Sequence, residues 1–450
     1  MKFKNFLIIF LLVIISATLI FFKFNSIPKY LAYDEVEFTK LALSLDNKPY
    51  IPYSNLATGH STLYFYIILF SLKIFGLTTF ALRLPAAIFG TLSLLIFYMI
   101  FLLSFRALAR NLATKGSAIH ASLDFSVTLF LRNDNWMAFL FTFIFLSSHW
   151  FLNFSRFAFE ATFLLFLELV SIYYLLLYIR VKSSTKVHSW SVLAFSGLFA
   201  GLAFNSYTPG RIFFVLPLSF LFISVIPLIQ NSKIKLMKIL LCFLVPFIIT
   251  VTPLTISFLT NKDTRIDQLF FWRNHEMTIS QKISGTLQNV STISQMFFIK
   301  GDMNGKHNYP GKPALNPILG VLFFAGLLIT LKDYKNFYNQ LFLLYFAISI
   351  FPSLAIYPWE NPSMLRTFTV LPSAIYFIAV SIYNIFTIGK KLIKKELYLF
   401  GIILVVFLLS SAYELRTYFK YQSAVFTQAF EIRLPLEKAI HIKNLYEKNK

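Results

Sequence analysis

The feature that most constrains this chain is a series of long apolar runs separated by short basic clusters. A helix that spans a bilayer needs about 20 mostly apolar residues, and eleven runs reach or approach that length: 6–22, 80–104, 136–152, 162–179, 190–204, 212–229, 239–259, 315–331, 341–357, 367–388 and 397–413. Of the 450 residues, 57% are hydrophobic and only 13% are charged. A water-soluble domain carries roughly 25% charged residues. The sequence therefore predicts an all-α integral membrane protein.

The positions of the basic residues predict the orientation of the chain. Lys and Arg gather in short segments between the runs, such as Lys2 and Lys4 at the start and Lys390–Lys395 near the end. Cytoplasmic loops of membrane proteins carry such an excess. We therefore expect a multi-pass protein of the cell (plasma) membrane with a cytoplasmic N-terminus. Topology explains the net charge of +22 better than nucleic acid does, since no contiguous basic patch is present.

One apolar stretch, 62–75, decides the topology. It is shorter than about 17 residues, the low end for a span. If it spanned, the later basic clusters would face outward. We predict a juxtamembrane helix there, within an outer loop at 23–79. A second outer loop then covers 260–314, and 1–413 forms one transmembrane domain with an extracytoplasmic tail at 414–450. The segment 105–135 is expected on the cytoplasmic side.

Acidic residues are scarce, so their positions are informative. Asp34 and Glu35 come shortly after the first run, and Glu160 lies among aromatics at the outer end of a later run. A carboxylate there can act as a general base or hold a divalent cation. The alternatives are a solvated cluster in the first turn of a helix for Asp34 and Glu35, and an i,i+4 ion pair with Arg156 for Glu160. The deeper Glu168 is expected to hydrogen-bond to a neighbouring helix.

Cationic residues at the outer boundary are candidates for binding phosphate. Arg211 and Arg366 each follow a turn-like segment, and a guanidinium can bind a phosphate with two hydrogen bonds. The alternative is an interfacial anchor that extends toward the headgroups. His60 is a candidate substrate or metal ligand, or a simple polar contact. Metalloprotease, ATPase and serine hydrolase functions lack their motifs HExxH, the P-loop and GxSxG.

Several short motifs, in their order along the chain, resemble a known enzyme family. They are Tyr33-Asp34-Glu35, His60-Ser61-Thr62-Leu63-Tyr64-Phe65-Tyr66, Ala81-Leu82-Arg83-Leu84-Pro85, Phe154-Ser155-Arg156-Phe157-Ala158, Tyr207-Thr208-Pro209-Gly210-Arg211 and Glu360-Asn361-Pro362 with Arg366. The set resembles the GT-C membrane glycosyltransferases of the family 39/83 type, which include protein O-mannosyltransferases and the aminoarabinose transferase that modifies lipid A. Two departures are Ser61-Thr62 in place of a usual proline pair, and a longer, more polar stretch at 107–135.

The resemblance implies a GT-C bundle of about eleven transmembrane helices, with the juxtamembrane helix in the first outer loop. It implies an inverting transfer of a sugar from a polyprenyl-phosphate donor to a hydroxyl on a protein, lipid or glycan acceptor. Asp34 matches the catalytic base. Glu35 is expected to orient Asp34 or hold a cation, and Glu160 to line the sugar pocket or bind the acceptor. The candidates for stabilising the leaving phosphate are Arg156, Arg211 and Arg366.

The main alternative is a multi-span transporter or lipid flippase. Such proteins carry ionisable groups near the bilayer midplane, whereas here only Glu168 is a deep acid and the polar residues gather at one face. This asymmetry favours an enzyme that acts at one surface. The polar, turn-rich segment 300–308 is a candidate for the acceptor site, although turn chemistry alone explains it equally well. The sugar, the acceptor and the need for a divalent cation stay open.

Overall fold

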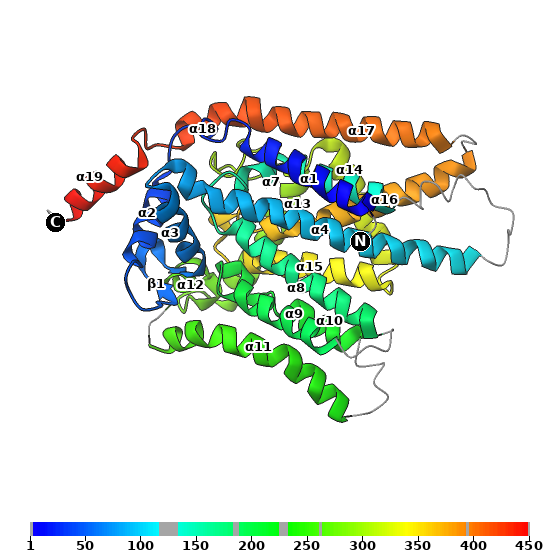
Figure 1. Cartoon of the computed structure of the whole chain (residues 1–450), viewed down its shortest axis with the longest axis horizontal. Helices are drawn as coiled ribbons and strands as arrows, with labels where there is room; N and C mark the ends of the chain where they lie inside the picture. The colour runs from blue at the N-terminus through cyan, green and yellow to red at the C-terminus, as the bar shows by residue number, and fades with distance from the viewer. Residues whose placement is uncertain are drawn as a thin grey trace.

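The computed structural model describes residues 3–116, 134–182, 189–224, 233–260, 263–392 and 396–448. Within these ranges the chain is almost entirely helical, and the strands are β1 (Tyr53–Ser54) and β2 (His60–Ser61), which form one short antiparallel hairpin. Long helices lie roughly side by side along the horizontal axis of Figure 1. The prediction of an all-α fold is confirmed.

The eleven apolar runs correspond to the long helices of the bundle. These are α1 (Phe3–Phe21), α4 (Thr79–Gly116), α6 (Asp134–Ser147) with α7 (His149–Phe154), α8 (Ala161–Lys182), α9 (Ser189–Phe204), α10 (Val215–Ser224), α11 (Lys233–Thr260), α14 (Pro317–Lys332), α15 (Phe337–Leu354), α16 (Leu371–Leu392) and α17 (Glu396–Arg416). Among the described residues, 6 helices are long and apolar enough to cross a membrane, and shorter apolar helices occupy the other runs. The number of spans stays a prediction.

Two of the predicted runs differ in detail from the helices. The run 136–152 is not one helix, because Ser148 has non-helical backbone angles and caps α7 after α6 ends. The run 212–229 is preceded by a 3₁₀ turn, η2 (Thr208–Ile212), and its helix, α10, begins only at Val215. At the 105–135 segment, α4 continues to Gly116, and residues 117–133 lie outside the described part of the chain. The cytoplasmic position of that segment therefore stays a prediction.

Glycine allows two pairs of helices to approach closely. A Cβ atom at Gly197 of α9 would overlap the carbonyl oxygen of Phe243 on α11, and one at Gly326 of α14 would overlap that of Phe377 on α16. Small residues at such crossings let backbones pack closely in membrane proteins, where lipid supplies no hydrophobic drive between helices. A larger side chain at either glycine would push its pair of helices apart.

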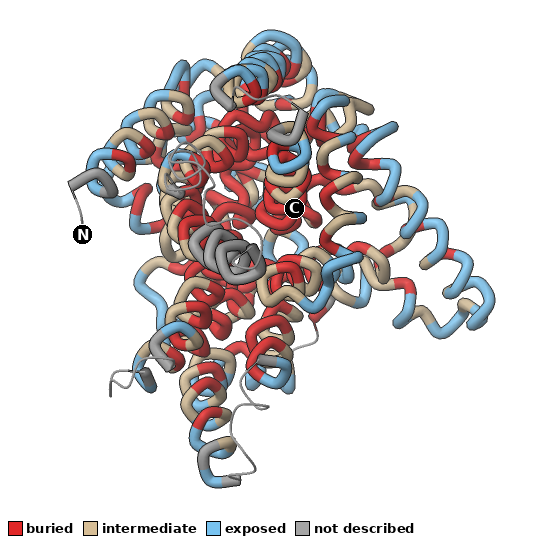
Figure 2. Tube along the Cα trace, turned by 90° about the vertical axis from the view of Figure 1, so that its right-hand side faces the viewer, coloured by how far each residue is buried: buried red, intermediate tan, exposed pale blue. Residues whose placement is uncertain are grey.

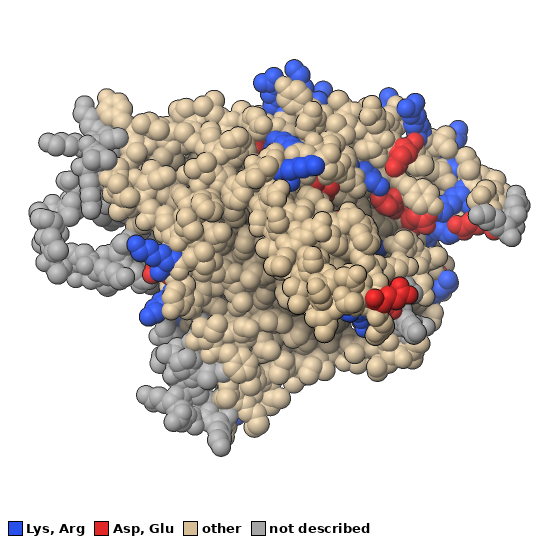
Figure 3. All heavy atoms as spheres, turned by 180° about the vertical axis from the view of Figure 1, so that it is seen from behind, with Lys and Arg blue, Asp and Glu red and all other residues tan. Residues whose placement is uncertain are grey.

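The outward faces of the bundle are apolar. Figure 2 shows buried residues concentrated in the middle and exposed residues on the outward sides. Exposed side chains include Leu259 of α11 and Val321 of α14, which are 82% and 71% accessible. In Figure 3 a broad zone of uncharged atoms covers the middle of the visible face, and most charged atoms gather toward one end. Such a belt suits a lipid environment.

Shorter elements connect the bundle helices. They are α2 (Tyr33–Ser44), η1 (Leu56–Thr58), α3 (Leu63–Phe75), α12 (Thr264–Leu269), η4 (Phe271–Arg273), α13 (Ile279–Phe298), η5 (Pro358–Glu360), η6 (Phe368–Val370), η7 (Thr417–Gln422), α18 (Ser423–Ala429) and α19 (Leu436–Lys448). The elements α2, α3, β1, α12 and α19 lie together at the left end of Figure 1. The helix predicted at 62–75 is α3. Its juxtamembrane position stays a prediction, as does the division of the chain at residue 413, where α17 continues to Arg416.

Candidate active site

A polar cavity of about 460 Å³ lies where the connecting segments meet. Its walls come from parts of the chain that are far apart in sequence: α2, the β1–β2 hairpin, α12, the 300–312 segment and the loop after α15. The lining side chains with ionisable groups are Asp34, His60, Tyr207, Arg265, Asp302, His307, Glu360 and Arg366. Three of the predicted site residues, Asp34, His60 and Arg366, are therefore brought together in one cavity.

Asp34 lies in the first turn of α2, where the partial positive charge of a helix N-terminus favours a carboxylate. Its side chain is 39% exposed, and its Oδ2 atom accepts a hydrogen bond from Nζ of Lys306 at 2.7 Å. The carboxylate is thus held in the cavity wall and remains accessible from the cavity. This is the arrangement that a general base requires.

Glu35, the next residue, does not line the cavity. It is fully buried, and its two carboxylate oxygens accept hydrogen bonds from Nε and Nη2 of Arg83 at 2.7 and 2.8 Å. Oε2 also accepts the backbone N–H of Ala32 just before α2. Both oxygens are occupied, so the expectation that Glu35 holds a cation is not supported. The pair with Arg83 instead fixes the start of the helix that carries Asp34.

Arg156 also lies away from the cavity. Its guanidinium is buried and donates to backbone carbonyls at the end of α1 and in the turn that follows, among them Ile20 at 2.8 Å and Phe22 at 2.7 Å. The last carbonyls of a helix have no partner within the helix, and Arg156 satisfies several of them. It therefore anchors the end of α1, and the expectation that it binds phosphate is not supported. The predicted alternative, an ion pair with Glu160, is not formed either.

Glu160 contacts His60, and His60 contacts Arg265. Nδ1 of His60 lies 2.7 Å from Oε1 of Glu160, and Nε2 lies 2.9 Å from Nη1 of Arg265. Arginine can only donate, so Nε2 accepts, and the proton of His60 lies on Nδ1 and is donated to Glu160. Glu160 is 1% exposed and sits behind His60 rather than in the cavity wall. Glu160 therefore does not line this cavity, and the expectation that it lines the sugar pocket or binds the acceptor stays a prediction.

The series of side-chain contacts from Glu160 through His60 to Arg265 sets the charge at the cavity wall. Burial alone raises the pKa of Glu160, which lies outside the predicted spans, but His60 and Arg265 together outweigh burial and bring this pKa below its ordinary value. Glu160 is thus an anion at neutral pH. It holds His60 in one orientation, and His60 with Thr58 directs the Arg265 guanidinium at the cavity wall.

Arg366 and Arg211 have different surroundings. Arg366 lines the cavity and pairs with Glu360, whose Oε2 atom lies 2.7 Å from Nη2. Arg211 pairs with Asp263 and lies 4.7 Å from the ring centre of Phe258, in a separate cavity of about 800 Å³. The structure therefore retains Arg366 as a candidate phosphate ligand of the first cavity, and it does not bring Arg211 to that cavity.

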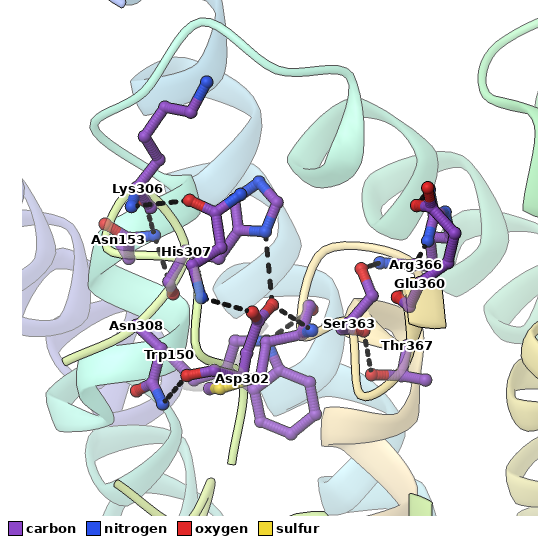
Figure 4. A network of polar contacts seen from close by, with 12 residues as sticks. Trp150, Asn153, Asp302, Lys306, His307, Asn308, Glu360, Ser363, Arg366 and Thr367 are labelled. Atoms are coloured by element: carbon purple, nitrogen blue, oxygen red, sulfur yellow. Dashed lines mark hydrogen bonds and ion pairs between the residues drawn. The ribbon is translucent and has the colours of Figure 1, made fainter. Parts of the chain in front are cut away.

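The 300–312 segment lines part of the cavity, and hydrogen bonds from α7 hold it in place. Figure 4 shows Asp302 among contacts from His307, whose Nδ1 atom lies 3.2 Å from Oδ2, and from neighbouring backbone N–H groups. Asn153 of α7 donates to the carbonyls of Lys306 and His307 at 2.9 and 3.0 Å. These buried contacts fix the position of Lys306, the residue that reaches Asp34.

The acidic side chains of the cavity do not form a metal site. Among the residues that the structure describes, no group of three or more His, Cys, Asp and Glu side chains could hold a metal ion. In the cavity Asp34 binds Lys306, Asp302 binds His307 and Glu360 binds Arg366. Each carboxylate already has a cationic or N–H partner, so this donor set does not fit a divalent cation held by protein alone.

Arg265 is a cavity residue that sequence analysis missed, and Trp359 is another. Arg265 lies at the start of α12, within the predicted outer loop 260–314, and nothing in its neighbourhood distinguishes it from Arg273, which forms a surface pair with Asp267. Its contact with His60 spans 205 positions in sequence. The sequence indicated this contact only indirectly, because Arg265 and His60 fall in segments that are predicted to lie on the same side of the membrane.

Comparison with solved structures identifies the fold. The structure of ArnT from Cupriavidus metallidurans bound to undecaprenyl phosphate matches with a TM-score of 0.54 at 12% sequence identity, over 96% of this chain and 77% of that chain. The archaeal oligosaccharyltransferase AglB from Archaeoglobus fulgidus, in complex with an inhibitory peptide and a dolichol-phosphate, matches with a TM-score of 0.52 at 14% identity, over 96% of this chain.

This chain covers 56% of the AglB chain, a little over half its length. By sequence, no family model and no curated protein matches. The likeness therefore lies in the arrangement of the helices, and it agrees with the expected bundle. The chain is a multi-pass membrane protein with the fold of the GT-C membrane glycosyltransferases.

Proposed function

We propose that the chain transfers a sugar from a polyprenyl-phosphate donor to a hydroxyl acceptor at the extracytoplasmic face of the cell membrane. The observation that carries this proposal is the composition of one cavity, in which the Asp34 carboxylate and the guanidiniums of Arg265 and Arg366 share the walls. A base for the acceptor and cations for a phosphate are the groups that such a transfer needs.

In the proposed reaction Asp34 accepts the proton of the acceptor hydroxyl as that oxygen attacks the anomeric carbon. The bond between the anomeric carbon and the phosphate oxygen breaks, and the configuration at the anomeric carbon is inverted. The lipid phosphate leaves with one more negative charge on its oxygen. Arg265 and Arg366 stabilise that charge, because preorganised donors in a site that excludes water stabilise a developing anion strongly. Lys306 holds the Asp34 carboxylate in place.

Two observations support a lipid-linked donor. The bundle presents apolar outward faces beside the cavity end of the molecule, as a polyprenyl tail requires. ArnT and AglB, which share the fold, were solved with undecaprenyl phosphate and a dolichol-phosphate respectively. No nucleotide-binding loop is needed, because the sugar is already activated in the donor.

The deep acid Glu168 supports an enzyme over a transporter. Its Oε2 atom accepts a hydrogen bond from the Tyr345 hydroxyl of α15 at 2.8 Å, as expected for a helix-to-helix contact. It is buried within the bundle and does not line the polar cavity. The ionisable groups that face a cavity lie at one end instead.

The test is transfer of a radiolabelled sugar from polyprenyl phosphate to native membrane extract by the purified chain in nanodiscs. We expect label to move to an acceptor with the wild type and a loss of at least about a hundredfold with Asp34→Asn. Asp267→Asn, a surface carboxylate paired with Arg273, is the matched control and should keep full activity. Unchanged transfer by Asp34→Asn would reject the base, and donor lipid crossing between leaflets without transfer would favour a flippase.

A further inference from the structure

Trp359 is an exposed tryptophan on the wall of the candidate active site. Its side chain is 76% accessible, and it lines the same cavity as Asp34 and Arg366. Tryptophan is highly buried on average in folded proteins. A large aromatic ring left open beside a polar cavity is a feature of ligand-binding surfaces, where Trp and Tyr are enriched.

The ring of Trp359 is held in place before any ligand arrives. It stacks on the ring of Tyr357 with centroids 4.3 Å apart and planes 20° from parallel. The Tyr357 hydroxyl accepts a hydrogen bond from Nδ2 of Asn274 at 3.0 Å, and its backbone N–H donates to the carbonyl of Leu269 at 3.2 Å. The pair is therefore a rigid platform, and rigidity lowers the entropy cost of binding.

The neighbouring cavity walls supply neutral polar groups. Asn304, Asn361 and Ser363 line the cavity together with Trp359. A pyranose ring has one face of C–H groups and a rim of hydroxyls. The negative face of an indole attracts the C–H face, while amide and hydroxyl side chains pair with the rim. A tryptophan that only anchors the protein at the membrane interface needs no such polar partners.

We propose that the exposed ring of Trp359, held in place by its stacking on Tyr357, binds the C–H face of a pyranose. This proposal rests on the proposed function, which explains why a sugar would bind there, but the binding can be measured without any transfer. The pyranose has two sources, the sugar of the lipid-linked donor or a sugar of a glycan acceptor. Both present the same face to the platform, so an experiment has to separate them.

The experiment measures binding to the full chain in nanodiscs. In the first arm, saturation-transfer NMR follows methyl α-D-mannopyranoside and methyl β-D-glucopyranoside. In the second arm, the affinity of a short-chain polyprenyl-phosphate mannose is compared with that of the same polyprenyl phosphate without sugar. The variants are Trp359→Ala and Trp359→Phe. The matched control is Trp272→Ala, which removes an exposed tryptophan that lines the other cavity.

We expect Trp359→Ala to weaken pyranose binding about tenfold, with Trp359→Phe and Trp272→Ala close to the wild type. A loss in the first arm with no loss in the second identifies a glycan acceptor, and a loss in the sugar-dependent part of the second arm identifies the donor. No effect of Trp359→Ala in either arm, or no pyranose binding by the wild type, overturns the proposal. If the wild type binds sugar through Trp359 but transfers none, the platform stands and the proposed function fails.

Discussion

Two clusters of side chains in this molecule have the same chemistry, but one reaches the wall of the polar cavity and the other is enclosed. Each contains a carboxylate, a histidine and a cation: Glu160, His60 and Arg265 in one, and Glu414, His149 and Lys312 in the other. The first ends at the wall of the polar cavity, because Arg265 and His60 line it. The second is enclosed on all sides, with His149 fully buried and the Lys312 side chain 9% exposed.

The partners of each cluster explain the difference. Glu414 also accepts a hydrogen bond from Asn316, and Nε2 of His149 lies 3.0 Å from Oδ1 of Asn308, so the second cluster fastens the chain on the C-terminal side of Lys306. The first cluster has one atom unsatisfied within the described chain, Oε2 of Glu160, and a guanidinium that faces open space. We therefore expect the closed cluster to serve stability and the open cluster to serve the proposed ligand binding.

The largest expected effect separates the two clusters by activity. Arg265→Ala should reduce transfer by roughly a hundredfold to a thousandfold, the loss typical when one donor to a developing anion is removed. Its thermal unfolding midpoint should fall less than that of Lys312→Met, since the guanidinium lies at the cavity wall and Glu160 keeps its contact with His60. Arg273→Ala, which removes an exposed guanidinium on the same loop, is the control. Normal transfer by Arg265→Ala would show that the open cluster does not face the phosphate.

The closed cluster should respond in stability instead. Lys312→Met leaves Glu414 buried with one cation fewer, and removing one partner of a buried ion pair costs about 3 kcal/mol of unfolding free energy. The measurement is the thermal unfolding midpoint in detergent, followed by tryptophan fluorescence. Lys282→Met, a lysine at the surface that donates to a backbone carbonyl, is the control. If Lys312→Met unfolds like the wild type but loses transfer, the assignment of the two clusters is reversed.

The smallest effect concerns pH. The pKa of Glu160 is lower in the folded chain than its ordinary value, so its contribution to stability is full above the unfolded pKa of about 4.3. That contribution is lost as the pH falls through the folded pKa. At pH values below about 4, the thermal unfolding midpoint of the wild type should therefore decrease more steeply with falling pH than that of Glu160→Gln. Parallel curves for the two proteins would mean that Glu160 does not gain its stabilisation from His60 and Arg265.

Local sequence predicted the helices and several site residues for identifiable reasons. Backbone groups that leave water have to be satisfied internally, so an apolar run forms a helix regardless of its neighbours. Asp34 could be singled out as a candidate because it comes shortly after the first run and lies in the first turn of a helix. The resemblance to GT-C enzymes, based on short motifs in order, agrees with the fold that the solved structures share.

Local sequence did not distinguish charged side chains that line the cavity from those that are satisfied inside the protein. Asp34 and Glu35 are adjacent, but successive residues on a helix point about 100° apart. One therefore faces the cavity, and the other meets Arg83 at a separation of 48 positions. Arg156 was expected to bind phosphate because it lies in a motif that resembles the GT-C enzymes, and it satisfies carbonyls of α1 instead. A motif in the sequence does not show whether a charge is satisfied within the protein or free to bind a ligand.

The sequence by itself determined that this chain is a bundle of apolar helices with its polar chemistry toward one end. Hydrophobic length and charge placement act locally, so they can be read along the chain. The tertiary structure alone decided which charges line the cavity. Arg265 reaches His60, and Lys306 reaches Asp34, only because packing brings distant segments together. The free energy of a charge depends on these partners and on its depth, and neither is encoded in the residues next to it.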